Sequence, residues 1–267
     1  MLQNIVLTLA YDGTFFEGFQ EQPYKRTVGG VLRKAVELVT GRTTRLIVAG
    51  RTDSGVHADA QIVNFLSVSD IPADRFYYNL KKYLPDDILV YRSEGASLRF
   101  HARFHSTWKT YCYVLSRGPL LHPKDRYRMA LCSYPLNIER MKRAAGKFLG
   151  THDFSAFSLP DPERSVVRTI TECTIKEEGN HLIFTIQGDA FLRQQVRIMA
   201  GALVDVGRGK LSADEISYAL EHGSRIPIAP TLPACGLTLS RIYWKNPEEN
   251  GEKKNESLHC NCFVNFS

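Results

Sequence analysis

The chain has 267 residues, 43% of them hydrophobic and 23% charged, which is ordinary for a soluble globular protein of one large or two smaller domains. No apolar run is long enough to cross a membrane and the N-terminus lacks the pattern of an export signal, so we expect a cytoplasmic protein. The six cysteines are scattered, which suits a reducing cytoplasm better than a disulfide framework.

The first half of the chain predicts the order strand, helix, strand, strand, helix, strand. The first helix has apolar residues at helical spacing and a plausible stop at Gly41. The second helix ends before Pro85. The predicted ranges are a strand at 5–10, a helix at 28–39, strands at 45–48 and 61–65, a helix at 73–84 and a strand at 88–91.

The second half repeats this order and adds one helix. Asn137 is a suitable N-cap for its first helix, and the run from Ser212 to Glu215 has the pattern of a capping box. The predicted ranges are a strand at 110–115, a helix at 138–149, strands at 166–175 and 182–186, a helix at 191–206, a helix after 212 and a strand at 236–244.

This double order predicts an α+β fold of two ferredoxin-like (βαββαβ) halves, with their antiparallel sheets side by side around a central basic cleft. We expect the N-terminal half at residues 1–105 and the C-terminal half at 106–245. Residues 246–267 are predicted to form a mobile tail, since the stretch 245–256 is charged and poor in apolar residues. The sequence suggests no role for residues 260–266, which include Cys260 and Cys262.

Positive charge is concentrated in one segment of the second half. The net charge of the chain is +6. Residues 97–147 contain eleven Lys or Arg residues and two acids, together with seven aromatic residues. Aromatic rings among basic side chains are typical of proteins that bind RNA or single strands, whose bases can stack. A solvated basic face over core aromatics explains the composition equally well.

A charged turn separates the predicted strands 45–48 and 61–65. It reads Gly50-Arg51-Thr52-Asp53-Ser54-Gly55-Val56-His57, and its glycines allow a tight, exposed backbone path. Asp53 is the strongest candidate for chemistry, because loops at the end of a rigid sheet often hold working residues. An aspartate in a turn also commonly hydrogen-bonds its own backbone, and the turn alone does not distinguish these roles.

The sequence contains no motif for a common cofactor or metal. It lacks a Walker loop, a Rossmann fingerprint, an HExxH helix and the paired motifs of zinc deaminases. His259, Cys260 and Cys262 offer too few ligands for a structural zinc site. We therefore expect carboxylate chemistry with no cofactor and no metal.

Six blocks of sequence together resemble the TruA-type tRNA pseudouridine synthases, over roughly residues 3 to 244 and in the order of that family. The blocks are Tyr11-Asp12-Gly13-Thr14 with Phe19-Gln20; the turn from Gly50 to Ala58; Phe100-His101-Ala102-Arg103-Phe104 with Lys109-Thr110-Tyr111-Cys112-Tyr113; His152-Asp153-Phe154-Ser155-Ala156-Phe157; the run from Gly188 to Arg197 with Gly201; and Gly236-Leu237-Thr238-Leu239. The turn is the most specific of them.

The resemblance implies the two-half fold and an enzyme that converts uridine to pseudouridine at positions 38, 39 and 40 of the tRNA anticodon stem-loop. It implies that tRNA is the partner and that the enzyme is a homodimer without a cofactor. Asp53 takes the place of the catalytic aspartate, and Arg197 that of the arginine paired with it. The implied substrate-binding residues are Tyr111, which stacks on the target base; Arg51, which helps to expel that base; and Leu237, Arg103 and Lys109.

Two other functions stay open from the sequence. The first is an RNA-binding or retargeted paralogue that kept the fold, and the presence of Asp53, Tyr111 and Arg197 together argues against loss of catalysis. The second is a different carboxylate enzyme, such as a nucleoside hydrolase, which would release free uracil. Gly29 departs from the glutamine that family members often have at this place, so we expect a slightly weaker first helical turn and altered contacts there.

Overall fold

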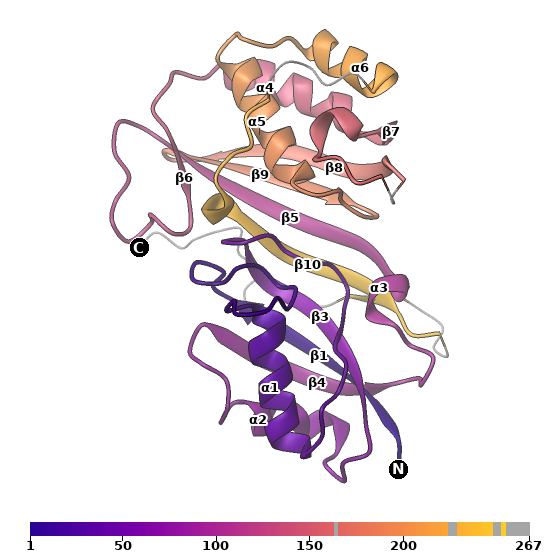
Figure 1. The fold of residues 1–267 in the computed structure, drawn as a ribbon. Coiled ribbons are helices and arrows are strands. Elements are labelled where there is room, and N and C mark those ends of the chain that lie inside the picture. Colours follow the sequence, from indigo (N-terminus) through magenta and orange to yellow (C-terminus); the bar gives the residue numbers. More distant parts are fainter. Residues whose placement is uncertain (163–164, 224–228, 248–251, 255–267) are drawn as a thin grey trace. The chain divides into compact units, whose positions relative to one another are not determined.

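A computed structural model describes residues 1–162, 165–223, 229–247 and 252–254. The chain divides into two compact units (Figure 1). Unit 1 comprises Met1–Lys109 and the chain from Thr238 onward, and unit 2 comprises Thr110–Leu237. The first boundary lies close to the predicted division at 105/106. The last strand differs, because it belongs to unit 1 and not to the second half.

Unit 1 contains a mixed sheet with the strand order β4-β1-β3-β10. β1 pairs antiparallel with both β3 and β4, whereas β3 and β10 are parallel, with Thr238 opposite His57. The helices α1 and α2 lie over one face of this sheet (Figure 1). The elements are β1 (Gln3–Tyr11), α1 (Val28–Thr40), β2 (Ile47–Val48), β3 (His57–Ser67), a 3₁₀ turn (Ala73–Arg75), α2 (Phe76–Leu80), β4 (Ile88–Ala96), α3 (Ala102–His105), β10 (Leu237–Lys245) and β11 (Glu252–Lys254).

The core of unit 1 is built from its central strands and from α1. Ile5, Leu7 and Leu9 of β1 are fully buried, as are Leu32 and Val36 of α1. The apolar stripe of α1 is the helical pattern expected from the sequence. Its ends also follow the sequence signals, since the Thr27 side chain accepts a hydrogen bond from the Gly30 amide and Gly41 closes the helix at φ 69°.

Buried amides fasten the segment after β4 to the same sheet. Asn4 of β1 donates through Nδ2 to the carbonyl oxygens of Ser97 and Phe100, at 2.8 and 2.9 Å. Asn64 of β3 donates to Asn4 Oδ1 at 2.9 Å and accepts from the Ala102 amide at 2.8 Å. Because unpaired polar groups are costly in a core, this network fixes residues 97–102 against β1 and β3.

Unit 2 contains a sheet with the strand order β5-β9-β8-β7, and β6 pairs with β5. The helices α4, α5 and α6 lie over one face of it (Figure 1). The elements are β5 (Ser106–Arg117), β6 (Ala130–Cys132), α4 (Ile138–Ala145), a 3₁₀ turn (Gly146–Phe148), β7 (Gly150–Asp153), a 3₁₀ turn (Ser155–Phe157), β8 (Val167–Glu178), β9 (His181–Gly188), α5 (Gln195–Gly207), α6 (Ala213–His222) and a 3₁₀ turn (Ala234–Gly236).

Several predictions of detail are wrong. The sheets are not purely antiparallel, because β3–β10 and β5–β6 are parallel pairs that no tight hairpin connects. The predicted helix 73–84 is split into a 3₁₀ turn and the short α2, and α5 begins only at Gln195 because Gln194 adopts a left-handed φ of 61°. Within the predicted tail, Glu252–Lys254 pairs with β10; residues 248–251 and 255–267, with Cys260 and Cys262, lie outside the described residues.

Candidate active site

The turn that contains Asp53 connects β2 and β3 in unit 1, and the segment before α1 holds it in place. Phe19 donates its amide to the Thr52 carbonyl oxygen at 3.1 Å. In return, the Phe16 carbonyl oxygen accepts the Gly55 amide and the Ser54 hydroxyl, both at 3.2 Å. These contacts lie on both sides of Asp53, so the backbone at Asp53 is fixed although it is part of a loop.

Gly13 allows the first block of the resemblance, Tyr11 to Thr14, to pack closely on the turn. A side chain at Gly13 would clash with the Val56 carbonyl oxygen. The Gly13 amide donates to His57 Nδ1 at 3.1 Å, and Asp12 Oδ1 lies 3.2 Å from the same nitrogen. Asp12 also accepts the Thr14 amide at 3.0 Å. His57 and Asp12 therefore connect the two segments, which is a structural role.

A buried polar network supports the base of the turn. The Tyr11 hydroxyl and Thr52 Oγ1 are 2.7 Å apart, and Gln61 Nε2 donates to the Tyr11 oxygen at 3.3 Å and to the Gly50 carbonyl oxygen at 2.8 Å. Burial raises the pKa of Tyr11 to about 12, against the opposing effect of its hydrogen bonds to Thr52 and Gln61. The network keeps the residues on both sides of Arg51 attached to the sheet.

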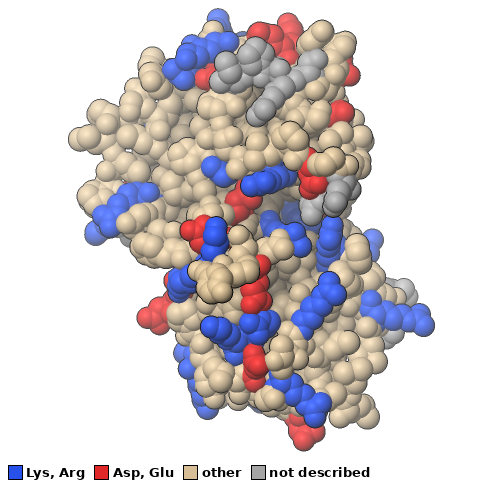
Figure 2. Space-filling model, viewed as in Figure 1, with Lys and Arg blue, Asp and Glu red and all other residues tan. Residues whose placement is uncertain are grey.

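Asp53 is half-buried, with the buried Thr52 before it and the buried Val56 after it. Arg51 is exposed. The turn therefore anchors its ends in the core and leaves these two charged residues at the surface of unit 1. Figure 2 shows Lys and Arg side chains distributed over the face of unit 1 on which α1 lies, with smaller acidic patches among them.

Lys109 and Arg103 differ from each other in exposure. Arg103 of α3 is exposed, as expected for a residue that contacts a nucleic-acid backbone. Lys109 is only 8% exposed; its stem packs against Gly50, and its amine donates to Ser106 Oγ at 3.1 Å. Lys109, one of the implied substrate-binding residues, is thus buried beside the turn.

Close packing explains why a glycine stands at position 29. A Cβ atom there would lie 2.6 Å from the Phe19 carbonyl oxygen, which accepts the Gly29 amide at 2.9 Å. The start of α1 therefore approaches the segment that holds the Asp53 turn more closely than a glutamine would allow in this conformation.

In unit 2, every residue of α5 except Arg197 is buried. Arg197 is half-buried, and its Nε donates to the Leu232 carbonyl oxygen at 2.7 Å. Gly201, one turn further along the helix, lies so close to Pro230 that a side chain would clash with its carbonyl oxygen. The segment 229–233 thus packs on α5 and fixes the guanidinium at its base.

Tyr111 and Leu237 are also buried in unit 2, at 7% and 5% exposure. The ring of Tyr111 on β5 meets Phe191 edge to face, with centroids 5.1 Å apart. The neighbouring Tyr113 donates its hydroxyl to the Pro233 carbonyl oxygen at 2.9 Å, and burial raises its pKa. The sequence did not single out Tyr113 or Phe191, although both lie inside the blocks that carry the resemblance.

Each unit brings together its own set of the predicted site residues. In unit 1 the structure gathers Arg51, Asp53 and Lys109 around one turn. In unit 2 it places Arg197 against the segment 229–233, a few residues before Leu237. The sequence did not predict the buried network of Tyr11, Thr52 and Gln61, because these residues are far apart in the chain and only the fold brings them together.

The comparisons with known proteins agree with the resemblance. A family model described as tRNA pseudouridine synthase matches residues 8–105 and 144–245. "tRNA pseudouridine synthase A" of Acetivibrio thermocellus is 42% identical over 91% of this chain and all of its own length, and that of Bacillus subtilis is 42% identical over 90% of this chain and 98% of its own length. "tRNA pseudouridine synthase A 2" of Clostridium perfringens is 37% identical over 91% of this chain and all of its own length.

The chain therefore belongs to the tRNA pseudouridine synthase family, whose members are isomerases that convert uridine to pseudouridine. Asp53, Arg51 and Arg103 lie in the first matched segment and Arg197 and Leu237 in the second, whereas Lys109 and Tyr111 lie between them.

Among the residues that the structure describes, no helix is both long and apolar enough to span a membrane, and no three His, Cys, Asp or Glu residues are grouped as metal ligands.

Proposed function

We propose that this protein isomerises uridine at positions 38, 39 and 40 of the tRNA anticodon stem-loop, with Asp53 as the catalytic carboxylate. The observation that supports this most strongly is the fixed backbone of the turn. The Phe19 amide donates a hydrogen bond to one side of the half-buried Asp53 and the Phe16 carbonyl oxygen accepts hydrogen bonds from the other, within the family-matched segment. We further propose two ferredoxin-like halves around a basic cleft, and a cytoplasmic homodimer.

The reaction requires one carboxylate and no redox step. The C1′–N1 bond of uridine breaks, the base turns, a C1′–C5 bond forms, and the proton lost from C5 is balanced by one gained at N1. Positive character develops on the sugar as the first bond breaks, as it does in glycoside hydrolysis. The ionised Asp53 either attacks C1′ or removes the C2′ proton at this stage. The rigid backbone holds the carboxylate at one distance from the sugar, which lowers the entropic cost of reaching the transition state.

Arg197 is proposed to pair with Asp53 and keep it ionised in a pocket that excludes water. A guanidinium suits this role because its planar fork binds a carboxylate through two hydrogen bonds. Its Nε is already bound to the Leu232 carbonyl oxygen, which orients the group, and every other residue of α5 is buried. An arginine held in this way loses little further side-chain entropy on pairing.

The remaining residues are proposed to handle the displaced nucleotide. A base that leaves its helix loses a few kcal/mol of stacking and pairing, and stacking on an aromatic ring returns about 1–3 kcal/mol. Tyr111, held edge to face by Phe191, would offer that ring with Leu237 as an apolar neighbour, and the exposed Arg51 would help to expel the base. Arg103 would contact the backbone, and the buried Lys109 would support the turn from below.

Substitution of the carboxylate tests the proposal directly. Asp53→Asn keeps the size of the side chain and the conformation of the turn but removes the negative charge. We therefore expect the variant to form no pseudouridine when it is incubated with unmodified tRNA, and to bind tRNA with a nearly unchanged Kd. Asp74→Asn is the matched control, because the Asp74 side chain is 72% exposed and its ion pair with the neighbouring Arg75 is long, at 3.8 Å. Product is mapped by carbodiimide-dependent reverse-transcription stops.

The same assay separates the alternatives. Pseudouridine formed by Asp53→Asn would refute the role of Asp53. A wild-type protein that binds tRNA without forming pseudouridine would favour the RNA-binding paralogue, and stops at other positions a retargeted enzyme. Release of free uracil would favour a hydrolase, because isomerisation leaves the mass of the RNA unchanged.

A further inference from the structure

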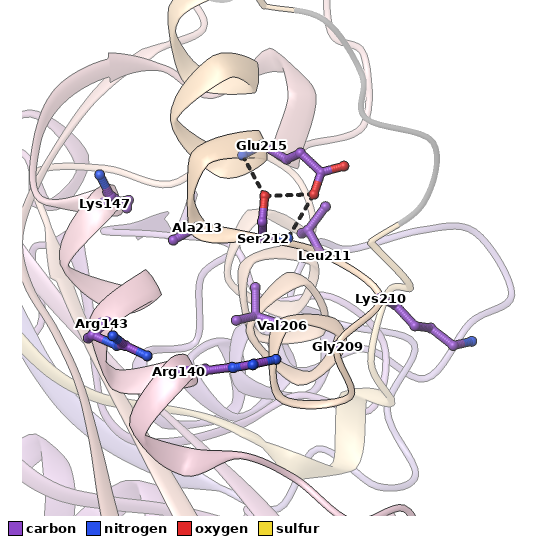
Figure 3. A pocket seen from close by; sticks show the side chains of 10 residues that line it. All are labelled: Arg140, Arg143, Lys147, Val206, Gly209, Lys210, Leu211, Ser212, Ala213 and Glu215. Carbon is purple, nitrogen blue, oxygen red and sulfur yellow. Dashed lines mark hydrogen bonds between the residues drawn. The ribbon is translucent and has the colours of Figure 1, made fainter.

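The helices of unit 2 enclose a pocket that none of the proposed catalytic residues lines. It has a volume of about 490 Å³ and lies between α4, the end of α5 and the start of α6 (Figure 3). Its charged walls are Arg140, Arg143 and Lys147 on the α4 side and Lys210 in the loop before α6, and Val206 and Leu211 contribute apolar surface. At the end of unit 2 where α4 and α6 lie, Figure 2 shows a group of Lys and Arg side chains with Asp and Glu side chains beside it.

The four cations of this pocket are not neutralised by acids. Within the described part of the chain, no carboxylate forms an ion pair with Arg140, Arg143, Lys147 or Lys210. Lys142, on the same helix, behaves differently, because it pairs with Glu139 at 3.0 Å and with Glu177 at 3.6 Å. One helix thus has a paired basic residue outside the pocket and unpaired ones within it, which is the charge distribution of an anion site.

Glu215 lines the pocket but is already engaged. Its Oε2 accepts the Ser212 amide at 2.8 Å and the Ser212 hydroxyl at 2.7 Å, and the Glu215 amide donates to the Ser212 oxygen at 3.2 Å. This capping box occupies the start of α6, and these hydrogen bonds lower the pKa of Glu215. The start of α6 is therefore already capped, and the positive charge that the pocket offers to an anion comes from the side chains on the α4 side and from Lys210.

The spacing of the cations fits a chain of phosphates better than a single ion. Arg140, Arg143 and Lys147 follow one another along α4 and its final 3₁₀ turn, over a rise of about 10 Å. In double-stranded DNA one strand presents a phosphate about every 3.4 Å along its axis, and an RNA strand likewise has one phosphate per nucleotide, so more than one phosphate falls within that length. The Arg140 side chain extends toward Gly209, with Nη1 4.0 Å from the position of a Cβ there (Figure 3).

We propose that this pocket binds the phosphodiester backbone of the tRNA substrate, at a point separate from the nucleotide that reacts. The inference rests on the proposed function, since it takes tRNA as the substrate. The contact adds affinity and orients the RNA, but it carries no sequence information, because phosphates are the same in every tRNA.

The test replaces the paired and the unpaired cations of α4 separately. Arg140→Gln/Arg143→Gln removes two exposed charges of the pocket, and Lys142→Gln is the matched control outside it. The Kd for an unmodified tRNA transcript is measured by filter binding between about 50 and 200 mM salt, a range over which phosphate contacts weaken measurably. Steady-state kinetics on the same transcript give KM and kcat.

For the double variant we expect a Kd about threefold to thirtyfold higher, as for two exposed charge contacts. We also expect the slope of log Kd against log salt to fall by about 2, since each lost contact removes about 0.9. KM should rise with Kd, and Lys142→Gln should match the wild type. Arg143→Glu, which reverses one charge, should weaken binding further than Arg143→Gln.

Two results would overturn the inference. An unchanged Kd and salt slope in the double variant would show that the pocket does not contact the RNA. Equal losses in Lys142→Gln and the double variant would show a general charge effect without a site. In both cases the wild type still forms pseudouridine, whereas a wild type without product would refute the proposed function instead.

Discussion

Tyr11→Phe tests whether the buried network below the Asp53 turn stabilises it. Tyr11 is 4% exposed, and its hydroxyl contacts Thr52 at 2.7 Å and Gln61 at 3.3 Å. The variant removes one oxygen from two buried hydrogen bonds. Each such bond contributes a net 0.5–1.5 kcal/mol, so we expect the free energy of unfolding at neutral pH to fall by about 1–3 kcal/mol.

The pH dependence of this difference is a sharper measurement than its size. Burial raises the pKa of Tyr11 from 10.0 to about 12, so the folded protein holds a proton that the unfolded chain releases above pH 10. The stabilisation is therefore complete below pH 10 and is lost as pH rises toward 12. With about 1.4 kcal/mol for each pH unit, the wild type loses about 2–3 kcal/mol that Tyr11→Phe does not lose. The two proteins should become nearly equal in stability near pH 12.

Guanidinium unfolding of both proteins at a series of pH values measures this convergence, and other titrating groups cancel in the difference. Tyr78→Phe is the control, because Tyr78 is 61% exposed and its removal should change stability by less than about 0.5 kcal/mol at any pH. A gap that stays constant from pH 8 to 12 would refute the claim that the Tyr11 hydroxyl is held protonated by burial. The variant should also lower kcat, because Thr52 is adjacent to Asp53.

Three further changes are expected to have definite outcomes. Gly201→Ala should lower the thermal unfolding temperature, because the clash with the Pro230 carbonyl oxygen costs about 1–3 kcal/mol and exceeds the gain in helix propensity of about 1 kcal/mol; a more stable variant would contradict the close packing. Cys173 should resist alkylation by iodoacetamide near pH 9 in the folded protein and react only on unfolding, because burial raises its pKa to about 12; rapid labelling of the folded protein would argue against this. Ser212→Ala should cost about 0.5–2 kcal/mol of stability through loss of the capping box, with an unchanged melting curve as the contrary result.

Local signals in the sequence determined most of the elements. The Thr27 cap, the stop at Gly41 and the capping box at Ser212 act within one helical turn, so the residues alone define where α1 and α6 begin and where α1 ends. The strands β1, β8 and β9 lie within a few residues of their predicted ranges because alternation of apolar residues is also local. The helix at 191–206 began too early in the prediction, since nothing in the sequence reveals the left-handed backbone of Gln194.

Only the tertiary structure decided which distant segments meet. The last strand belongs to unit 1, and its parallel pairing with His57 and Ala58 of β3 depends on a partner about 180 residues away in the chain. The Asp53 turn also depends on distant segments. The resemblance in sequence pointed to Asp53, but the hydrogen bonds of the turn with Phe16 and Phe19, which fix its backbone, appear only in the fold. In the sequence, Lys109 and the basic residues on the α4 side of the pocket are all simply positively charged residues. The fold buries Lys109 and leaves the others as unpaired charges in a pocket, because burial depends on neighbours that are remote in sequence.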